Sequence, residues 1–186
     1  KMKNYWQNAV TFDEYIKETE RRIEVQNPED DHNEYYELGL QRMNRTLKTY
    51  KVDEEQLETL KSKNFNGKIL IITEPWCGDA SATVPAVSKF FEGHNEVRIF
   101  YRDSDTSLID QFLTNGTQSI PKILILNEDF SLKNVWGPRP QYGTELLKKF
   151  KENPETYPRE EFYNDLQVYY AKNKGKDAIQ EILDLL

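Results

Sequence analysis

The sequence is poor in cysteine, histidine and long apolar runs. It contains one cysteine, Cys77, and two histidines among 186 residues. A single cysteine cannot form an intramolecular disulfide, which excludes a disulfide-stapled secreted module and favours a reducing compartment. No window approaches the roughly 20 apolar residues of a transmembrane helix, and the first twenty residues contain no apolar run of signal-peptide length. We therefore expect a cytoplasmic protein that does not bind a membrane.

Basic residues are fewer than acidic ones. Asp and Glu number 32 against 25 Lys and Arg, so the net charge is −7. Such a surface repels nucleic-acid phosphates and anionic membranes, so we expect neither as a partner. Asp30, Asp31, His32 and Glu34 form the one group that resembles metal ligands, but acids at a helix start explain them. We expect no metal and no organic cofactor.

The first third of the chain has the pattern of helices. Sequences typical of capping boxes occur at 11–14, 31–34 and 53–56, and each is followed by a segment that we expect to be helical. No strand pattern appears before residue 68.

The pattern then alternates between apolar runs and helical segments. Strands are expected at 68–73, 97–101, 122–126 and 131–136, and helices at 81–91, 107–113 and 144–152. Strands separated by helices favour parallel pairing, whereas the tight turn at 127–130 favours an antiparallel hairpin. These elements predict an α/β fold: a mixed central sheet with helices on both faces.

Helical segments extend this unit at both ends. We expect an N-terminal helical extension at 1–51, a central domain at 52–152 and a C-terminal helical extension at 153–186. In the last of these, Phe162, Leu166 and Tyr169 share a helical face. Tyr169 and Tyr170 are interpreted as packing residues of the added helices.

Cys77 lies where the first strand leads into a helix. Backbone N–H groups and the helix dipole at such a position favour a thiolate, which is the reactive form of cysteine. Asp79 opposes this effect, because a nearby carboxylate repels a thiolate. The sequence leaves open which effect determines the pKa of Cys77.

The segment WCGDA, residues 76–80, resembles the WCGPC motif of thioredoxins at the same strand-to-helix junction. Pro85 matches the proline of the active-site helix in that family, Ile120-Pro121 matches its cis-proline loop, and Gly137 matches the glycine of its third loop. The resemblance covers about residues 52–152 and implies a thioredoxin-like fold with Cys77 as the nucleophile. It also implies the residues that present the substrate: Trp76, Gly78, Asp79, Ile120, Pro121 and Gly137.

Three departures from the thioredoxin pattern weigh against ordinary turnover. The second cysteine is replaced by Ala80, the buried carboxylate by Ile71, and the motif proline by Asp79. Without a second thiol the chain cannot resolve its own mixed disulfide, so dithiol reductase or oxidase chemistry is excluded for this chain alone.

Three explanations of the lone thiol remain open at this point. Cys77 exchanges with a low-molecular-weight thiol or disulfide, or with a protein partner, and an external thiol resolves the product. Alternatively, the chain is a non-catalytic adaptor or chaperone that keeps the cis-proline groove, or Ala80 replaces a natural cysteine and traps a mixed disulfide. The oligomeric state is left open.

Two sets of basic residues allow more than one interpretation. Arg139, next to the predicted groove, could attract a carboxylate, as on a glutathione-like thiol, or stabilise a thiolate, but an ordinary surface arginine is favoured. Arg42, Arg45, Lys48 and Lys51 recur every three residues and could form a basic stripe for a phosphate-bearing partner, but the net charge favours the solvated face of a helix.

Overall fold

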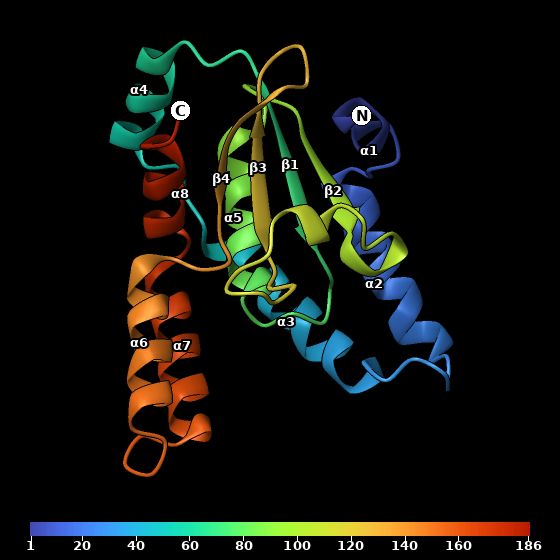
Figure 1. The fold of residues 1–186 in the computed structure, drawn as a ribbon, viewed down its shortest axis with the longest axis vertical. Helices are drawn as coiled ribbons and strands as arrows, with labels where there is room; N and C mark the ends of the chain where they lie inside the picture. The colour runs from blue at the N-terminus through green and yellow to red at the C-terminus, as the bar shows by residue number, and fades with distance from the viewer.

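The computed structural model describes residues 1–186 as a mixed α/β structure with added helices (Figure 1). The strands are β1 (Lys68–Thr73), β2 (Val97–Tyr101), β3 (Lys122–Leu126) and β4 (Leu132–Trp136). The helices are α1 (Met2–Gln7), α2 (Phe12–Val25), α3 (Asn33–Thr49), α4 (Glu54–Lys63), α5 (Ala80–Phe91), α6 (Gln141–Glu152), α7 (Arg159–Asn173) and α8 (Lys176–Leu183).

The four strands form one sheet in the order β2-β1-β3-β4. β1 pairs with β2 in parallel and with β3 in antiparallel orientation, and β3 and β4 form an antiparallel hairpin. Every residue of β3 is buried, as expected of a strand covered on both faces. The predicted mixed sheet and thioredoxin-like α/β fold are confirmed.

This topology brings four chain segments to one edge of the sheet. β1 and β2 both end there, since Thr73 pairs with Tyr101, while β3 begins and β4 ends there, since Ile123 pairs with Trp136. The segments that follow β1 and β4 and precede β3 must therefore meet beyond this edge. They contain Cys77, Gly137 and Pro121, respectively.

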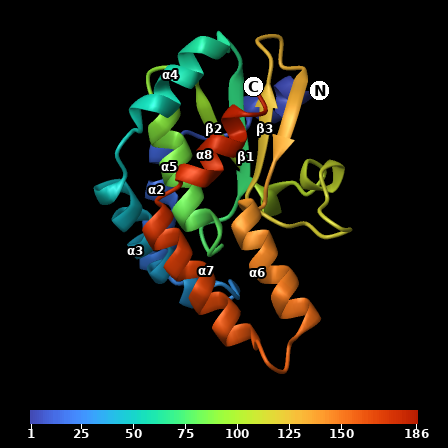
Figure 2. The same cartoon turned by 90° about the vertical axis from the view of Figure 1, so that its left-hand side faces the viewer.

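Helix α5 is apolar on nearly all sides because it is covered on nearly all sides. All of its residues except Lys89 are buried, and α3 and α8 pack against it. Figure 2 shows α3, α4 and α5 on one side of the sheet and the segment between β2 and β3 on the other. The added helices are thus an outer layer over α5.

The predicted helix at 107–113 is wrong. The structure has only short 3-10 turns, Arg102–Ser104 and Ile109–Gln111, between β2 and β3. Because β2 ends and β3 begins at the same edge of the sheet, no crossover helix is needed. Leu108 and Ile109 are fully buried, which explains the apolar pattern of this segment without a helix.

The N-terminal helices differ from expectation in two details. The predicted capping box at 31–34 is wrong: α3 has His32 at its N-cap and no side-chain cap. The box at 11–14 is confirmed, because Thr11 and Glu14 cap each other reciprocally. Helix α1 was not predicted, although its Trp6 belongs to the main core.

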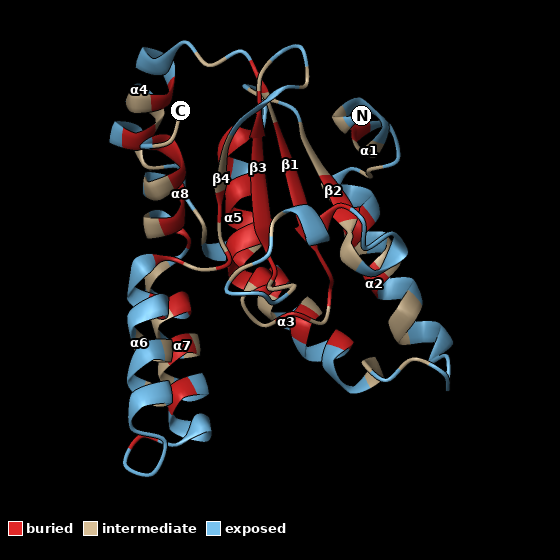
Figure 3. Cartoon of the chain, in the orientation of Figure 1, coloured by how far each residue is buried: buried red, intermediate tan, exposed pale blue.

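Helices α6 and α7 extend beyond the sheet as a pair (Figure 1), and their outer surfaces are largely exposed (Figure 3). A small apolar cluster lies between this pair and the start of α5, and its members are Ala82, Tyr157, Phe162, Leu166 and Tyr170. The sequence analysis placed Tyr169 on this face, three residues after Leu166. In the structure the buried residue is Tyr170, four residues after Leu166. No helix has the length and apolar character needed to cross a membrane.

Candidate functional site at the Cys77 loop

Cys77 lies between the end of β1 and the first turn of α5. Its side chain is buried, with 8% of the residue exposed, and it belongs to the main apolar core. The thiol donates a weak hydrogen bond to the carbonyl of Ile120, with Sγ 3.4 Å from the oxygen. The sulfur is therefore directly beside the residue that precedes Pro121.

Burial, and after it the Asp79 carboxylate, raise the pKa of the Cys77 thiol to about 12. The backbone N–H groups of Ala80 and Asp79, and the Arg139 guanidinium, lower this pKa but do not prevail. The balance that the sequence left open is thus decided by burial. At neutral pH only about one thiol in 10⁵ is ionised.

Asp79 is held by two side chains from the C-terminal part of the chain. Arg139 donates two hydrogen bonds to its carboxylate, with Nη2 2.8 Å from Oδ2 and Nε 3.3 Å from Oδ1. The hydroxyl of Tyr170 on α7 donates to Oδ1. Both charged side chains of the pair are mostly buried, 16% exposed for Arg139 and 13% for Asp79. The interpretation of Arg139 as an ordinary surface arginine is wrong.

The cis-proline loop and the third loop touch each other. The Ile120–Pro121 peptide bond is cis, as the sequence predicted, and Gly137–Pro138 is cis as well. Gly137 has a φ of +121°, and a Cβ added there would lie 2.4 Å from the carbonyl oxygen of Pro121. Only glycine fits this approach.

The buried side chain of Lys122 connects the cis-proline loop to the third loop by a hydrogen bond. Lys122 follows Pro121 directly and is only 7% exposed. Its Nζ donates to the Gly137 carbonyl at 3.2 Å and to the Thr114 hydroxyl at 2.6 Å. Desolvation lowers the pKa of Lys122, and no carboxylate forms an ion pair with it.

Trp76 is partly covered by its neighbours. The His32 ring stacks on it with centroids 4.2 Å apart and planes 7° apart. The Arg102 guanidinium lies 5.0 Å from the centre of the Trp76 ring, at cation–π distance. The loop before α3 and the segment after β2 therefore both contact the residue that was predicted to line the groove.

Helices α3 and α7 flank the motif loop. Gly39 of α3 approaches so closely that a Cβ there would lie 2.5 Å from the Pro75 carbonyl oxygen. Gln167 of α7 donates from Nε2 to the Gly78 carbonyl at 3.3 Å. The added helices thus form part of the walls around this loop.

A second acidic residue of the loop, Glu74, is buried, with 3% of its side chain exposed. Its carboxylate accepts from the Asp103 backbone N–H at 2.9 Å and from Arg22 Nη1 at 3.3 Å. Desolvation raises the pKa of Glu74 despite these partners. The position of the thioredoxin family's buried carboxylate, Ile71, is fully buried in the core.

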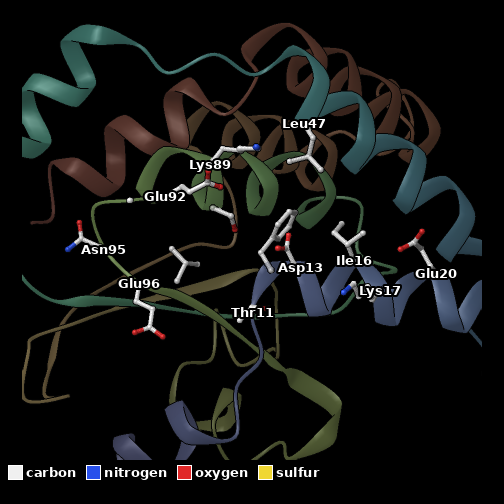
Figure 4. A pocket seen from close by; sticks show the side chains of 14 residues that line it. Thr11, Asp13, Ile16, Lys17, Glu20, Leu47, Lys89, Glu92, Asn95 and Glu96 are labelled. Atoms are coloured by element: carbon white, nitrogen blue, oxygen red, sulfur yellow. The ribbon is translucent and has the colours of Figure 1, made fainter.

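The main cavities do not include the cysteine. One of about 530 Å³ lies between α2, α5 and the segment leading into β2, lined by both acidic and basic side chains (Figure 4). No group of three or more His, Cys, Asp or Glu side chains is arranged to hold a metal ion.

The structure brings the sequence-predicted residues together around one point. Cys77, Ile120, Pro121 and Gly137 are connected by direct contacts, and Trp76, Gly78 and Asp79 belong to the loop that carries the thiol. Their roles in binding or catalysis stay predictions. Sequence reasoning missed the contacts of Tyr170 and Gln167 with the motif loop, because α7 is far from the motif in sequence, and it missed the pairing of Arg139.

Comparisons with known proteins agree with this geometry. A family profile described as Thioredoxin matches residues 25–151. The crystal structure of an HIV epitope scaffold is similar with a TM-score of 0.67 at 15% identity, covering 98% of this chain and 94% of that one. PA1234, a protein of unknown function from Pseudomonas aeruginosa, is similar with a TM-score of 0.60 at 17% identity, covering 97% of this chain and 93% of that one.

At these identities the two solved structures show a shared fold alone. No curated protein matches the chain. The family profile, by contrast, covers more than half of the sequence, including the motif loop, the cis-proline loop and the third loop. The chain therefore belongs to this thioredoxin family, as a member with a single cysteine in its motif.

Proposed function

We propose that this protein exchanges disulfides through Cys77 alone, with an external thiol completing the cycle. The observation that supports this most directly is the position of the thiol, 3.4 Å from the Ile120 carbonyl at the junction of the three loops. A substrate that pairs with the backbone before Pro121 would place its sulfur next to Cys77.

The proposed chemistry balances with one thiol on the protein. Cys77 Sγ forms a bond to one sulfur of a disulfide, the substrate S–S bond breaks, and the proton lost by Cys77 is taken up by the leaving sulfur. A second thiol then attacks the mixed disulfide and restores Cys77. The substrate-presenting roles of Trp76, Gly78, Asp79, Ile120, Pro121 and Gly137 belong to this proposal.

The raised pKa favours a second candidate, a binding module that retains the groove but not the chemistry. A thiol with a pKa of about 12 is a poor nucleophile at neutral pH. In that case the loops would hold a protein partner non-covalently. The first candidate requires that the bound substrate exchange at a low thiolate fraction, which positioning next to the sulfur can offset.

One experiment separates the two candidates. The protein is incubated with the neutral bis(2-hydroxyethyl) disulfide between pH 7 and pH 10, and adduct formation is followed by intact mass, with Cys77→Ala as the blank. A single adduct that forms faster than on the unfolded chain in urea at the same pH supports exchange. No adduct in the folded protein, while the unfolded chain reacts, refutes exchange and leaves the binding module.

A further inference from the structure

We propose that Arg42 forms a carboxylate-binding subsite beside the Cys77 loop, so that the preferred exchange partner is a low-molecular-weight thiol or disulfide that carries a carboxylate. This inference rests on the proposed exchange function and assigns its substrate class. It assigns a role to a residue outside the motif, the cis-proline loop and the third loop.

Arg42 comes from α3 and reaches the motif loop from the side of Gly78. Its Nη1 lies 3.6 Å from the point where a Cβ of Gly78 would stand. Gly78 follows Cys77 directly, so the guanidinium lies beside the residue next to the thiol. A carboxylate a few bonds from a sulfur at Cys77 could therefore reach it.

The Arg42 guanidinium has no partner in the protein. It takes part in no side-chain hydrogen bond, ion pair or cation–π contact, although the side chain is partly buried. Burial and the neighbouring Arg45 lower its pKa, so both oppose the positive charge. A partly desolvated guanidinium with five free donors gains most from a bidentate anion.

Gln167 supplies a second unfilled group at the same place. Its Nε2 lies 3.2 Å from the same Cβ position and donates to the Gly78 carbonyl. Its Oε1 is buried and accepts no hydrogen bond. An unsatisfied acceptor beside an unsatisfied cation fits a ligand in which an N–H group stands next to a carboxylate, as in an amino acid or short peptide.

The other cations near the loop are not available for this task. Arg139 is paired with Asp79 through Nε and Nη2, and Arg45, one turn along α3, is exposed to solvent. The interpretation of the stripe as a solvated helix face therefore holds for Arg45 and Lys48 but is wrong for Arg42, and Lys51 is exposed beyond the end of α3. Because the net charge of the chain is −7, general attraction would not concentrate an anion here, and the local guanidinium is needed.

The first test measures binding without any reaction at sulfur. The ligand is 3-(methylthio)propionate, whose thioether cannot exchange, and its match is the neutral 3-(methylthio)propanol. The shift of the Gly78 backbone amide is followed by NMR in the wild type, in Arg42→Gln and in Arg45→Gln. We expect a saturable shift with the carboxylate only, weakened at least about tenfold by Arg42→Gln and unchanged by Arg45→Gln.

The second test measures the consequence for exchange. Rates of Cys77 adduct formation are compared for 3,3′-dithiodipropionate and the neutral bis(2-hydroxyethyl) disulfide. We expect Arg42→Gln to lower the ratio of the two rates about tenfold and Arg45→Gln, which removes the same charge, to leave it unchanged.

The outcomes separate this inference from the proposed function. No Gly78 shift with the carboxylate, or equal loss in both variants, overturns the subsite whether or not Cys77 reacts. Adduct formation with the neutral disulfide in the absence of any Gly78 shift leaves exchange standing and removes only the substrate class. A carboxylate-specific shift with no adduct from either disulfide refutes exchange and leaves a subsite of the binding module.

Discussion

Arg42 and Arg139 are two guanidinium groups beside the motif loop, and they differ in whether they neutralise a carboxylate. Arg139 is 16% exposed and makes two hydrogen bonds to Asp79, which is buried to a similar degree. Arg42 is also partly buried, yet it has no carboxylate within reach. Burial alone therefore does not define the role of a charge: Arg139 neutralises a buried carboxylate, whereas Arg42 forms no ion pair.

The two arginines also differ in their effect on the thiol. Arg139 lowers the pKa of Cys77 and Asp79 raises it, and the effect of Asp79 is the larger, so the ion pair offsets only part of its own influence on the sulfur. The desolvation of the thiol is the first cause of its raised pKa. The loop is therefore arranged to keep Cys77 protonated in the resting protein.

The largest expected effect comes from removing Arg139. The variant Arg139→Met leaves Asp79 buried beside Cys77 without its cation, and breaking such a pair costs about 2–4 kcal/mol of the free energy of unfolding. Urea denaturation at pH 7 measures the loss. The pKa of Cys77 should rise further, so alkylation at pH 9 should also become slower.

The matched control is the double variant Arg139→Met/Asp79→Asn. Removing both charges should recover most of the lost free energy, because no buried charge is left alone. If the single variant is as stable as the wild type, the ion pair is not a structural element and the contrast with Arg42 fails.

Alkaline pH should reveal the buried thiol as a loss of stability. The pKa of Cys77 is raised to about 12 in the folded state, whereas an unfolded thiol ionises near about 8.5–9. Between these values the unfolded chain has released the proton that the folded chain still holds, so stability falls as pH rises. The loss reaches at most about 4–5 kcal/mol across this window, at about 1.4 kcal/mol per pH unit.

Cys77→Ala provides the measurement of that loss, since it removes the titrating group. Urea unfolding of both proteins between pH 8 and 10.5 should show a steeper decline in the wild type. Buried tyrosines such as Tyr36 and Tyr50, whose pKa values are raised to about 12, contribute equally to both curves. Parallel curves would mean that the folded thiol ionises as easily as the unfolded one.

An intermediate effect is expected from Asp79→Asn. This change removes the carboxylate that raises the pKa of Cys77 and leaves the Arg139 guanidinium, which lowers it. The pKa should fall by about one unit or more, since removing one nearby charge is worth at least about 1 kcal/mol. Iodoacetamide labelling at pH 9 should therefore be about tenfold faster than in the wild type.

Labelling must be measured with the fold intact, because Asp79→Asn also weakens the ion pair. Circular dichroism before each reaction provides that control. An unchanged or slower rate in a folded variant would assign the raised pKa to burial alone.

A smaller effect is expected from Tyr170→Phe. Its hydroxyl donates to Asp79, and the ring is 3% exposed within the cluster between α7 and α5. Losing a hydrogen bond to a charged acceptor that keeps other partners costs about 1–2 kcal/mol. The matched variant is Tyr169→Phe. The Tyr169 hydroxyl donates to Asp177 and not to the motif loop, so the pKa of Cys77 is compared between the two variants.

Residue pattern predicted most of the fold and the centre of the site. Apolar runs placed three of the four strands with the observed bounds, and for β1 and β3 the reason is burial on both faces, which requires a nearly continuous apolar composition. The segment at 107–113 failed, since its buried Leu108 and Ile109 produce an apolar pattern without a helix. The motif and its spacing located Cys77, Pro121 and Gly137.

The outer parts of the site depend on contacts between segments far apart in sequence. Tyr170 lies 91 residues from Asp79 and Gln167 lies 89 residues from Gly78. Neither pairing leaves a local signal, although Phe162, Leu166 and Tyr170 recur at four-residue spacing and could have identified the buried face of α7. For Arg42, periodicity predicts only which side of α3 it occupies, not that the motif loop packs against that side.

We expect Arg42→Gln to have the smallest effect on stability. This variant therefore tests most directly whether Arg42, unlike Arg139, lacks a structural partner. A cation without a partner contributes nothing through pairing, and its partial burial opposes the charge. The free energy of unfolding should therefore change by no more than about 0.5 kcal/mol, against the several kcal/mol expected for Arg139→Met. Urea denaturation of the two variants side by side decides the matter. A large loss in Arg42→Gln would mean that the guanidinium already has a structural partner, and a group so engaged would not be free to receive a carboxylate.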